Sequence, residues 1–260
     1  KRQQKQLQDL IHQFIQKDYP FDVREKLVKS EDGFSKDFWK TFSQFGLLAM
    51  PFSEEDGGYN GGPVDVMIIL EAFGTGLIVE PYIPNIVLSG NLVSKLGTKE
   101  QKDSILPNLL DGDMQLAFAF SEPQSRFDLN DVTTSAEEDG DGFKLNGFKS
   151  VVMNGPAADK LIISARTSGS QLDKNGISLF IVDRDTKGVS LRDYSNIDGS
   201  KASELTLENV VLTKEALLGD LGKAFPTIEE VVNLATLAIS AEAIGIMQKM
   251  NELTLESVSY

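Results

Sequence analysis

The run Gln115-Leu116-Ala117-Phe118-Ala119-Phe120-Ser121-Glu122-Pro123 marks the change of pattern that decides the fold of this chain. Before this run, apolar residues recur every three or four positions, which is typical of amphipathic helices. After it, short apolar or alternating runs are separated by clusters of Gly, Asp and Asn, which is typical of strands and turns. From about Ala224 the helical period returns. Helices, then strands, then a helix favour two domains and the beginning of a third.

The segment before this run is expected to be helical. Two apolar stripes at helical spacing are formed by Leu7, Leu10, Ile11, Phe14 and Ile15, and by Phe34, Phe38, Trp39 and Phe42. Ser35 is placed to cap the helix that carries the second stripe, and Gly46 is placed to end it. Two more helices are expected near Ile86–Leu96 and Lys99–Leu110, the second capped by Thr98.

The middle of the chain is expected to form strands. The candidate runs are Leu116–Phe120, Phe143–Met153, Leu161–Ala165, Ser178–Val182 and Ala202–Leu207. Asn146-Gly147 has the composition of a tight hairpin turn. The predicted fold is therefore α+β and multidomain. It has an all-α domain over residues 1–113, an antiparallel β sandwich or barrel over 114–222, and the first helix of a C-terminal helical bundle over 223–260.

Composition excludes several classes of function. The formal net charge of −14 argues against binding to nucleic acid or to an anionic membrane surface. Without cysteine, and with His12 as the single histidine, the chain can form no thiolate site, no catalytic triad and no multi-histidine metal site. The polar start, Lys1 to Gln8, lacks the apolar core of a signal peptide. Polar residues interrupt the longest apolar stretch, Val231 to Met247, so we expect a buried helix and a cytoplasmic protein.

The residues alone say little about chemistry. The chain has no glycine-rich phosphate loop of the GxGxxG or GxxxxGK kind. Most of its carboxylate clusters lie in polar turns, where they are expected to be solvated. The segment Ser121 to Arg126 differs, because it follows an apolar strand directly and stays polar, and ligand contacts concentrate in such loops.

Six motifs, in order and with matching spacing, resemble those of the acyl-CoA dehydrogenase family. They are Phe38-Trp39 through Leu48, Pro51 with Glu54 to Gly58, Gly97 to Lys102 leading to Pro107, Ala119 to Pro123, Asn146 to Lys149 with Asn154-Gly155, and Ala241 to Gly245. Within the family, Glu122 to Leu129 and Lys149 to Val152 are most similar to the subgroup that contains the small subunit of pimeloyl-CoA dehydrogenase.

This resemblance implies FAD bound between the middle and C-terminal domains of a homo- or heterotetramer. It implies α,β-desaturation of an acyl-CoA thioester, in which a carboxylate removes the α-proton and the β-hydrogen leaves as hydride to flavin N5. The electrons then pass to an electron-transfer flavoprotein. Hydrogen bonds to the thioester oxygen are expected to contribute most to catalysis.

The resemblance also assigns residues. The positions that match the family's flavin contacts are Phe118, Phe120, Ser121, Phe127, Val151, Val152 and Met153. The positions that match substrate contacts are Ser125, Arg126, Phe127, Asn233 and Thr236. Val151 and Met153 stand where an indole and a hydroxyl are usual, and Thr236 stands where a cation is usual.

No catalytic base is assigned within the chain. Most family members carry it beyond the position of Tyr260, and a minority carry it where this chain has Ala235. Glu229 and Glu230 are nearby but out of register. Three hypotheses remain open: an FAD-dependent acyl-CoA dehydrogenase, a non-catalytic subunit of a heteromeric dehydrogenase, and an acyl-CoA or flavin binding module without turnover.

Overall fold

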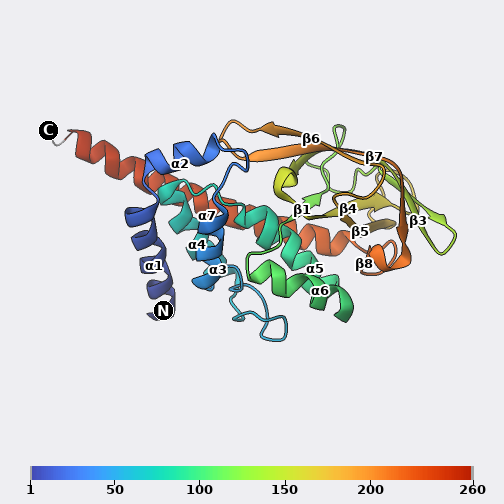
Figure 1. Ribbon diagram of the computed structural model, residues 1–260, viewed down its shortest axis with the longest axis horizontal. Coiled ribbons are helices and arrows are strands. Elements are labelled where there is room, and N and C mark those ends of the chain that lie inside the picture. Colours follow the sequence, from blue (N-terminus) through green and yellow to red (C-terminus); the bar gives the residue numbers. More distant parts are fainter. Residues whose placement is uncertain (1, 259–260) are drawn as a thin grey trace.

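The computed structural model describes residues 2–258, and it places the helices at one side of the molecule and the sheet at the other (Figure 1). The helices of the first part are α1 (Arg2–Asp18), α2 (Phe21–Val28), α3 (Lys36–Gln44), α4 (Pro63–Gly76), the π-helix η1 (Ile83–Gly90), α5 (Asn91–Leu96) and α6 (Lys99–Leu110). The long helix α7 (Phe225–Val258) starts beside the sheet and runs along the helical part, where it packs against α4, η1 and α5 (Figure 1).

The helix ends follow the sequence closely. The Ser35 side chain accepts a hydrogen bond from the Phe38 amide at 3.1 Å, so the predicted N-cap of α3 is confirmed. Gly46, just beyond the end of α3, has a φ of +76°, a conformation that glycine adopts without steric cost. Thr98 caps α6 and forms a capping box with Gln101.

The strands form one mixed sheet that bends around its own core. They are β1 (Leu116–Ala119), β2 (Ser135–Asp139), β3 (Gly142–Met153), β4 (Lys160–Arg166), β5 (Ile177–Asp183), β6 (Val189–Ser195), β7 (Lys201–Thr213) and β8 (Leu217–Leu218). Two short 3-10 helices, η2 (Gly155–Ala157) and η3 (Lys214–Ala216), join them. The order is β6-β7-β3-β2-β4-β5-β8, and β1 pairs with β4.

Two strand predictions need correction. The prediction that Asn146-Gly147 forms a hairpin turn is wrong, because both residues lie inside β3, at a bulge opposite β7. The Asn146 side chain accepts a hydrogen bond from the Asn209 amide across this bulge, and a Cβ on Gly147 would lie 2.5 Å from Thr134 Oγ1. The sheet is also not purely antiparallel, because β1 runs parallel to β4.

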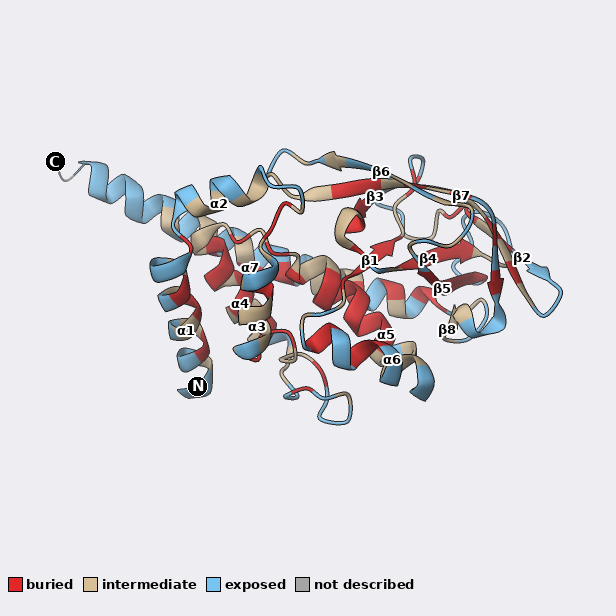
Figure 2. Ribbon diagram, viewed as in Figure 1, coloured by how far each residue is buried: buried red, intermediate tan, exposed pale blue. Residues whose placement is uncertain are grey.

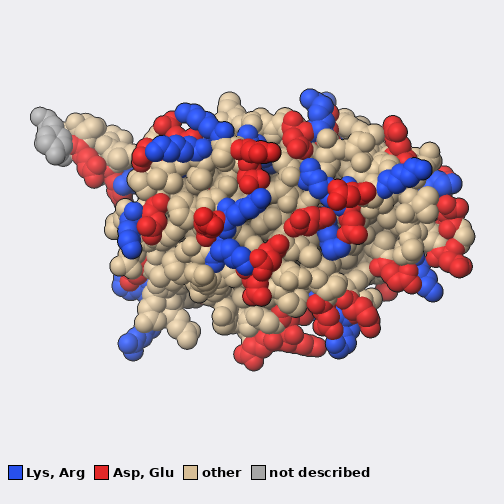
Figure 3. All heavy atoms as spheres, in the orientation of Figure 1, with Lys and Arg blue, Asp and Glu red and all other residues tan. Residues whose placement is uncertain are grey.

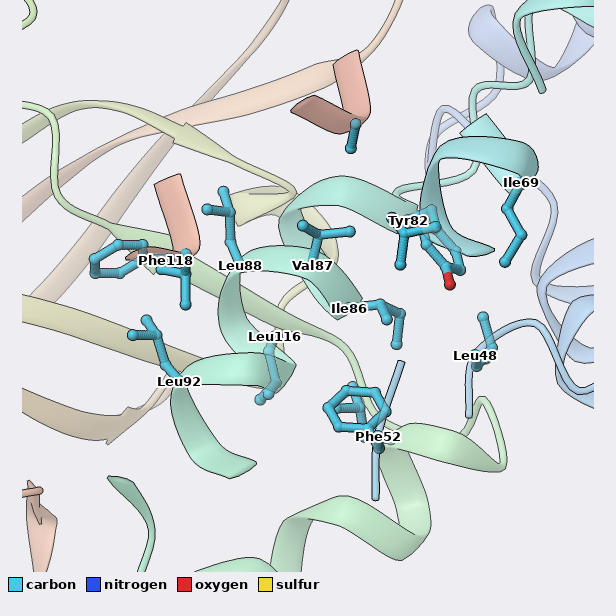
Figure 4. Close-up of a cluster of buried hydrophobic side chains, with 14 of the residues drawn as sticks. Leu48, Phe52, Ile69, Tyr82, Ile86, Val87, Leu88, Leu92, Leu116 and Phe118 are labelled. Carbon is cyan, nitrogen blue, oxygen red and sulfur yellow. The ribbon is translucent and has the colours of Figure 1, made fainter. Parts of the chain in front are cut away.

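Two apolar cores meet at β1, whose four residues are all buried. Leu116 and Phe118 face the helices, where Figure 4 shows them near Leu88 and Leu92. The alternate residues of β1 face the core enclosed by the sheet. Because both faces of β1 are covered, the strand joins the sheet to the helical layer (Figure 2).

The helices α4 and α7 approach each other through glycine. A Cβ on Gly74 of α4 would lie 2.1 Å from the carbonyl oxygen of Glu242, and one on Gly245 of α7 would lie 1.9 Å from that of Glu71. Real Cβ atoms essentially never come so close to another atom, so this crossing requires glycine on both helices.

Candidate functional site

The ends of β1 and β3 meet beside the helices. Ser121 and Val151 form an antiparallel bridge, and the Ser150 amide donates to the Ser121 carbonyl at 2.9 Å. Val151 and Met153 expose 41% and 37% of their surface, although both are apolar. These three residues, Ser121, Val151 and Met153, are called the ledge below. The ledge brings together positions that are far apart in the sequence and that were all predicted to contact flavin.

Two of the predicted flavin contacts can offer only their backbone. Val152 alternates with its neighbours along β3 and is fully buried in the core of the sheet. Phe118 is buried against the helices, with its ring 4.7 Å from the ring of Phe120. Phe120 is half-buried and reaches the cavity described below.

The loop after β1 separates the other predicted residues. Ser125 is buried and folds back on Glu122, accepting from its amide at 3.1 Å and donating to its carbonyl at 2.9 Å. Its hydroxyl therefore has a structural role here. Arg126 has a φ of +50°, which is uncommon for a residue other than glycine. The next residue, Phe127, is 96% exposed, so this loop presents an aromatic side chain to the outside.

Glu122 and Lys149, which are close to the ledge residues in the sequence, form a buried ion pair. The Lys149 ammonium donates to Glu122 Oε1 at 2.8 Å and to the Ser164 hydroxyl at 2.9 Å, and neither charged side chain is exposed. Thr133 also donates to Glu122, from both its amide and its hydroxyl. Burial alone would raise the pKa of the Glu122 carboxyl, but the charge of Lys149 and these hydrogen bonds outweigh it and lower the pKa to about 2.

An apolar cavity of about 500 Å³ opens beside the ledge. Phe120 and Met153 line its sheet end. The other walls include the end of α4, the segment that joins it to η1, residues 32–34, η2, the turn between β6 and β7, and one face of α7. A cavity of this size and character suits an elongated apolar ligand.

Of the two predicted substrate residues on α7, one lines the cavity and the other does not. Thr236 and Ala235 line the cavity, whereas Asn233 is exposed and is not among the lining residues. The Thr236 hydroxyl donates to the Val232 carbonyl at 2.9 Å. Glu230 lies away from this wall and pairs with Lys95 at 2.7 Å, and Glu229 does not line the cavity.

Two carboxyls that sequence reasoning missed, Glu80 and Glu242, line the cavity. Glu80 is 4% exposed; its Oε2 accepts from the Ser35 amide at 3.0 Å, and its Oε1 has no hydrogen-bond partner. Burial raises the pKa of Glu80 to about 7. Burial, and then the nearby charge of Asp198, raise the pKa of Glu242 to about 7. A glutamate next to proline, as Glu80 is, carries no sequence signal for such a position.

The raised pKa of Glu80 predicts a pH effect on stability. The folded protein holds a proton on Glu80 that the unfolded chain releases above pH 4.5, so the free energy of unfolding should fall as pH rises from about 4.5 to about 7. The Glu80→Gln variant keeps an acceptor for the Ser35 amide and should reduce this fall by about 3 kcal/mol. Urea unfolding at pH 5 and pH 8 measures it. An unchanged pH dependence in the variant would mean that Glu80 does not hold this proton. The pKa of Glu242 is also raised to about 7, so Glu242 should likewise make the free energy of unfolding fall as pH rises.

Other kinds of site are not supported within residues 2–258. No group of three or more His, Cys, Asp or Glu residues could hold a metal ion there. Positive and negative side chains are mixed over the face drawn in Figure 3. By length and composition, α7 could cross a membrane, which alone is weak evidence; in this fold it packs against α4 and η1.

Two domain families match the chain. The acyl-CoA dehydrogenase N-terminal domain matches residues 1–113, and the acyl-CoA dehydrogenase middle domain matches residues 117–210. This chain belongs to the acyl-CoA dehydrogenase family. Known members include dehydrogenases and reductases. The matches agree with the predicted order of a helical part followed by a β part.

Two similar acyl-CoA dehydrogenase family proteins are named as reductases. The 3-(aryl)acrylate reductase of Clostridium sporogenes is 34% identical over 83% of this chain and 58% of its own length. The caffeyl-CoA reductase-Etf complex subunit CarC of Acetobacterium woodii is 28% identical over 95% of this chain and 66% of its own length. The chain thus spans about three fifths to two thirds of these relatives.

Solved structures agree on the fold. The butyryl-CoA dehydrogenase of Megasphaera elsdenii is 26% identical with a TM-score of 0.84, over 95% of this chain and 66% of that one. The FAD complex of PigA has a TM-score of 0.89 at 22% identity, over 98% of this chain and 68% of that one. The pimeloyl-CoA subgroup is not among these relatives, and that part of the resemblance stays a prediction.

Proposed function

We propose that this chain is the flavin- and acyl-binding part of an FAD-dependent enzyme that oxidises, or in reverse reduces, the α,β carbon–carbon bond of an acyl-CoA thioester. The observation that carries the proposal is the continuity of the ledge with the cavity, because Met153 belongs to both. A planar cofactor against the ledge would lie at the mouth of a cavity that suits an acyl chain.

The chemistry of the ledge fits the flavin ring. Val151 and Met153 offer an exposed apolar surface, and the Ser121 hydroxyl makes no hydrogen bond to any described residue. A flavin ring needs these two features, an apolar support and a donor for its polar edge. The exposed Phe127 is proposed to contact the rest of the cofactor. FAD, when bound, supplies the acceptor for hydride.

The chain's own residues position the substrate and exclude water. Ala235 and Thr236 form the cavity wall where the family would otherwise place a base or a cation, so neither can remove a proton. As the family resemblance implies, the base is proposed to come from outside residues 1–260; Glu80 and Glu242 also line the cavity, but at positions that do not match the family's base. Electron-transfer flavoprotein as electron partner, a homo- or heterotetrameric assembly and a cytoplasmic location complete the proposal. The name of the relative CarC, a subunit of an Etf complex, supports the first of these.

A substitution on the ledge tests the proposal. In the full-length protein, Val151→Asp places a carboxylate on the apolar support and is expected to weaken FAD binding at least tenfold, roughly 1.4 kcal/mol. Val211→Asp, on an exposed valine of β7 away from the ledge, is the matched control and should bind FAD normally. FAD affinity is measured by fluorescence titration of the apoprotein.

Activity separates the enzyme from the alternatives. Bleaching of bound FAD by an acyl-CoA under anaerobic conditions supports the enzyme. A protein that binds FAD and acyl-CoA without bleaching supports a binding module. A protein that binds neither contradicts the proposal and favours a non-catalytic subunit of a heteromeric dehydrogenase.

A further inference from the structure

The cavity is apolar along most of its length but has unsatisfied polar groups at one end. Along α7, Glu242 lies two turns beyond Ala235, about 10 Å farther from the sheet. The charge of Asp198 raises the pKa of Glu242, and the charge of Arg24 lowers the pKa of Glu80. Since Arg24 donates to the Asp198 carbonyl at 2.8 Å, both glutamates lie near one Arg24–Asp198 contact. This region is called the far end of the cavity.

No described lysine or arginine forms an ion pair or hydrogen bond with either glutamate, although the charge of Arg24 lowers the pKa of Glu80. Arg24 donates to the carbonyls of Leu77 and Asp198. Lys201 donates to the Ser195 hydroxyl at 2.8 Å. The remaining carboxylate that lines the cavity, Asp32, pairs with Lys36 at 3.1 Å.

Each glutamate thus keeps an oxygen that no described side chain pairs, although Glu80 accepts from the Ser35 amide through its other oxygen and has the Tyr19 hydroxyl nearby. Glu80 Oε1 is buried without a hydrogen-bond partner, whereas the Glu242 carboxyl is half-buried and accepts from no described side chain. A buried polar oxygen without a partner is costly, so a ligand group that satisfies it gains affinity. Apolar lining would suffice for a plain alkyl chain, and these two carboxyls would only weaken its binding.

We infer that the acyl group accepted by this cavity carries a hydroxyl group near its far end, which hydrogen-bonds Glu80 and Glu242. The inference rests on the proposed function and names its substrate class. A hydroxyl both donates and accepts, so it can pair with each carboxyl whether or not the carboxyl holds a proton. A second carboxylate on the acyl chain would instead meet two acidic groups and would be repelled whenever they are charged.

Three acyl-CoAs of equal chain length test the inference: hexanoyl-CoA, 6-hydroxyhexanoyl-CoA and adipoyl-CoA. Binding to the full-length FAD-loaded protein is measured by calorimetry, and FAD bleaching is followed in parallel. We expect 6-hydroxyhexanoyl-CoA to bind at least tenfold more tightly than either of the others. In the Glu80→Leu variant this preference over hexanoyl-CoA should disappear, while binding of hexanoyl-CoA should be unchanged or tighter.

Two controls keep the result interpretable. Glu229→Gln changes an exposed glutamate of α7 outside the cavity and should leave the preference intact. Glu242→Leu should reduce the preference, and it provides the test if Glu80→Leu does not fold. Equal binding of the hydroxylated and plain chains, or tightest binding of adipoyl-CoA, overturns the inference while the proposed function stands. Failure of all three to bind or bleach FAD overturns both.

Discussion

Replacing Lys149 by methionine is expected to destabilise the folded protein by about 3–5 kcal/mol, because it leaves the buried Glu122 carboxylate without its cation. Neither side chain of this pair is exposed, and the ion pair is 2.8 Å long. The hydrogen bonds from Thr133 remain in the variant, but they do not supply a compensating charge. Urea unfolding at pH 7 measures the loss of free energy.

The acid dependence of stability gives a second signature of the pair. Because the pKa of Glu122 is lowered to about 2, its contribution is complete above its ordinary pKa of 4.5 and is lost as pH falls toward 2. In Lys149→Met the cation is gone, so burial dominates and this loss on acidification should disappear. The double variant Lys149→Met/Glu122→Gln removes both charges and should recover much of the stability.

A neighbouring lysine provides the matched control. Lys144 lies on the same strand, β3, but it is partly exposed and its contact with Asp139 is long, at 3.8 Å. Lys144→Met should therefore change stability by less than about 1 kcal/mol. If the Lys144 and Lys149 variants were equally stable, the buried pair would not have the role described above.

Replacing Gly245 by alanine is expected to cost about 2–4 kcal/mol, although alanine favours a helix over glycine by about 1 kcal/mol. The new methyl group would lie 1.9 Å from the Glu71 carbonyl oxygen and 3.2 Å from the Cα of Gly74. Both obstacles are helix backbone, so no side chain can rotate away. The helices α4 and α7 would have to separate, which would open the apolar packing between them.

Thermal or urea unfolding measures the effect, and Gly62→Ala is the control. A Cβ on Gly62 meets nothing within 4 Å, and its φ of −90° is open to alanine. The control should stay within about 1 kcal/mol of the parent protein. A Gly245→Ala variant as stable as the Gly62→Ala variant would mean that the close crossing of α4 and α7 is not required.

Local patterns in the sequence predicted much of the fold. The caps Ser35 and Thr98 act through neighbouring amides, so the sequence near each helix is sufficient to find them. Strand β2, Ser135–Asp139, was missed because its acidic, mostly exposed residues show no apolar alternation. The prediction of a hairpin turn at Asn146-Gly147 was wrong because this glycine is required for another reason. Thr134 approaches it closely, and that contact exists only in the folded sheet.

The candidate site was only partly predictable for the same reason. The residues of the ledge were named from family motifs as flavin contacts, and the structure brings two of them, Ser121 and Val151, side by side. The carboxyls Glu80 and Glu242 face a cavity whose walls come from segments far apart in the chain. Their raised pKa values arise from burial by those segments, which no local pattern records.

The crossing of α4 and α7 has a consequence for the order of events during synthesis. The apolar side of α4 is covered by a helix that the ribosome makes only after the whole sheet has been translated. Until then the N-terminal helices expose apolar surface that attracts chaperones or other nascent chains. The interval lasts roughly 7–30 seconds at ordinary elongation rates of roughly 5–20 residues per second, because the chain from Gly76 to Phe225 must first be translated. The protein therefore cannot complete its first domain as an independent unit while it is still being made.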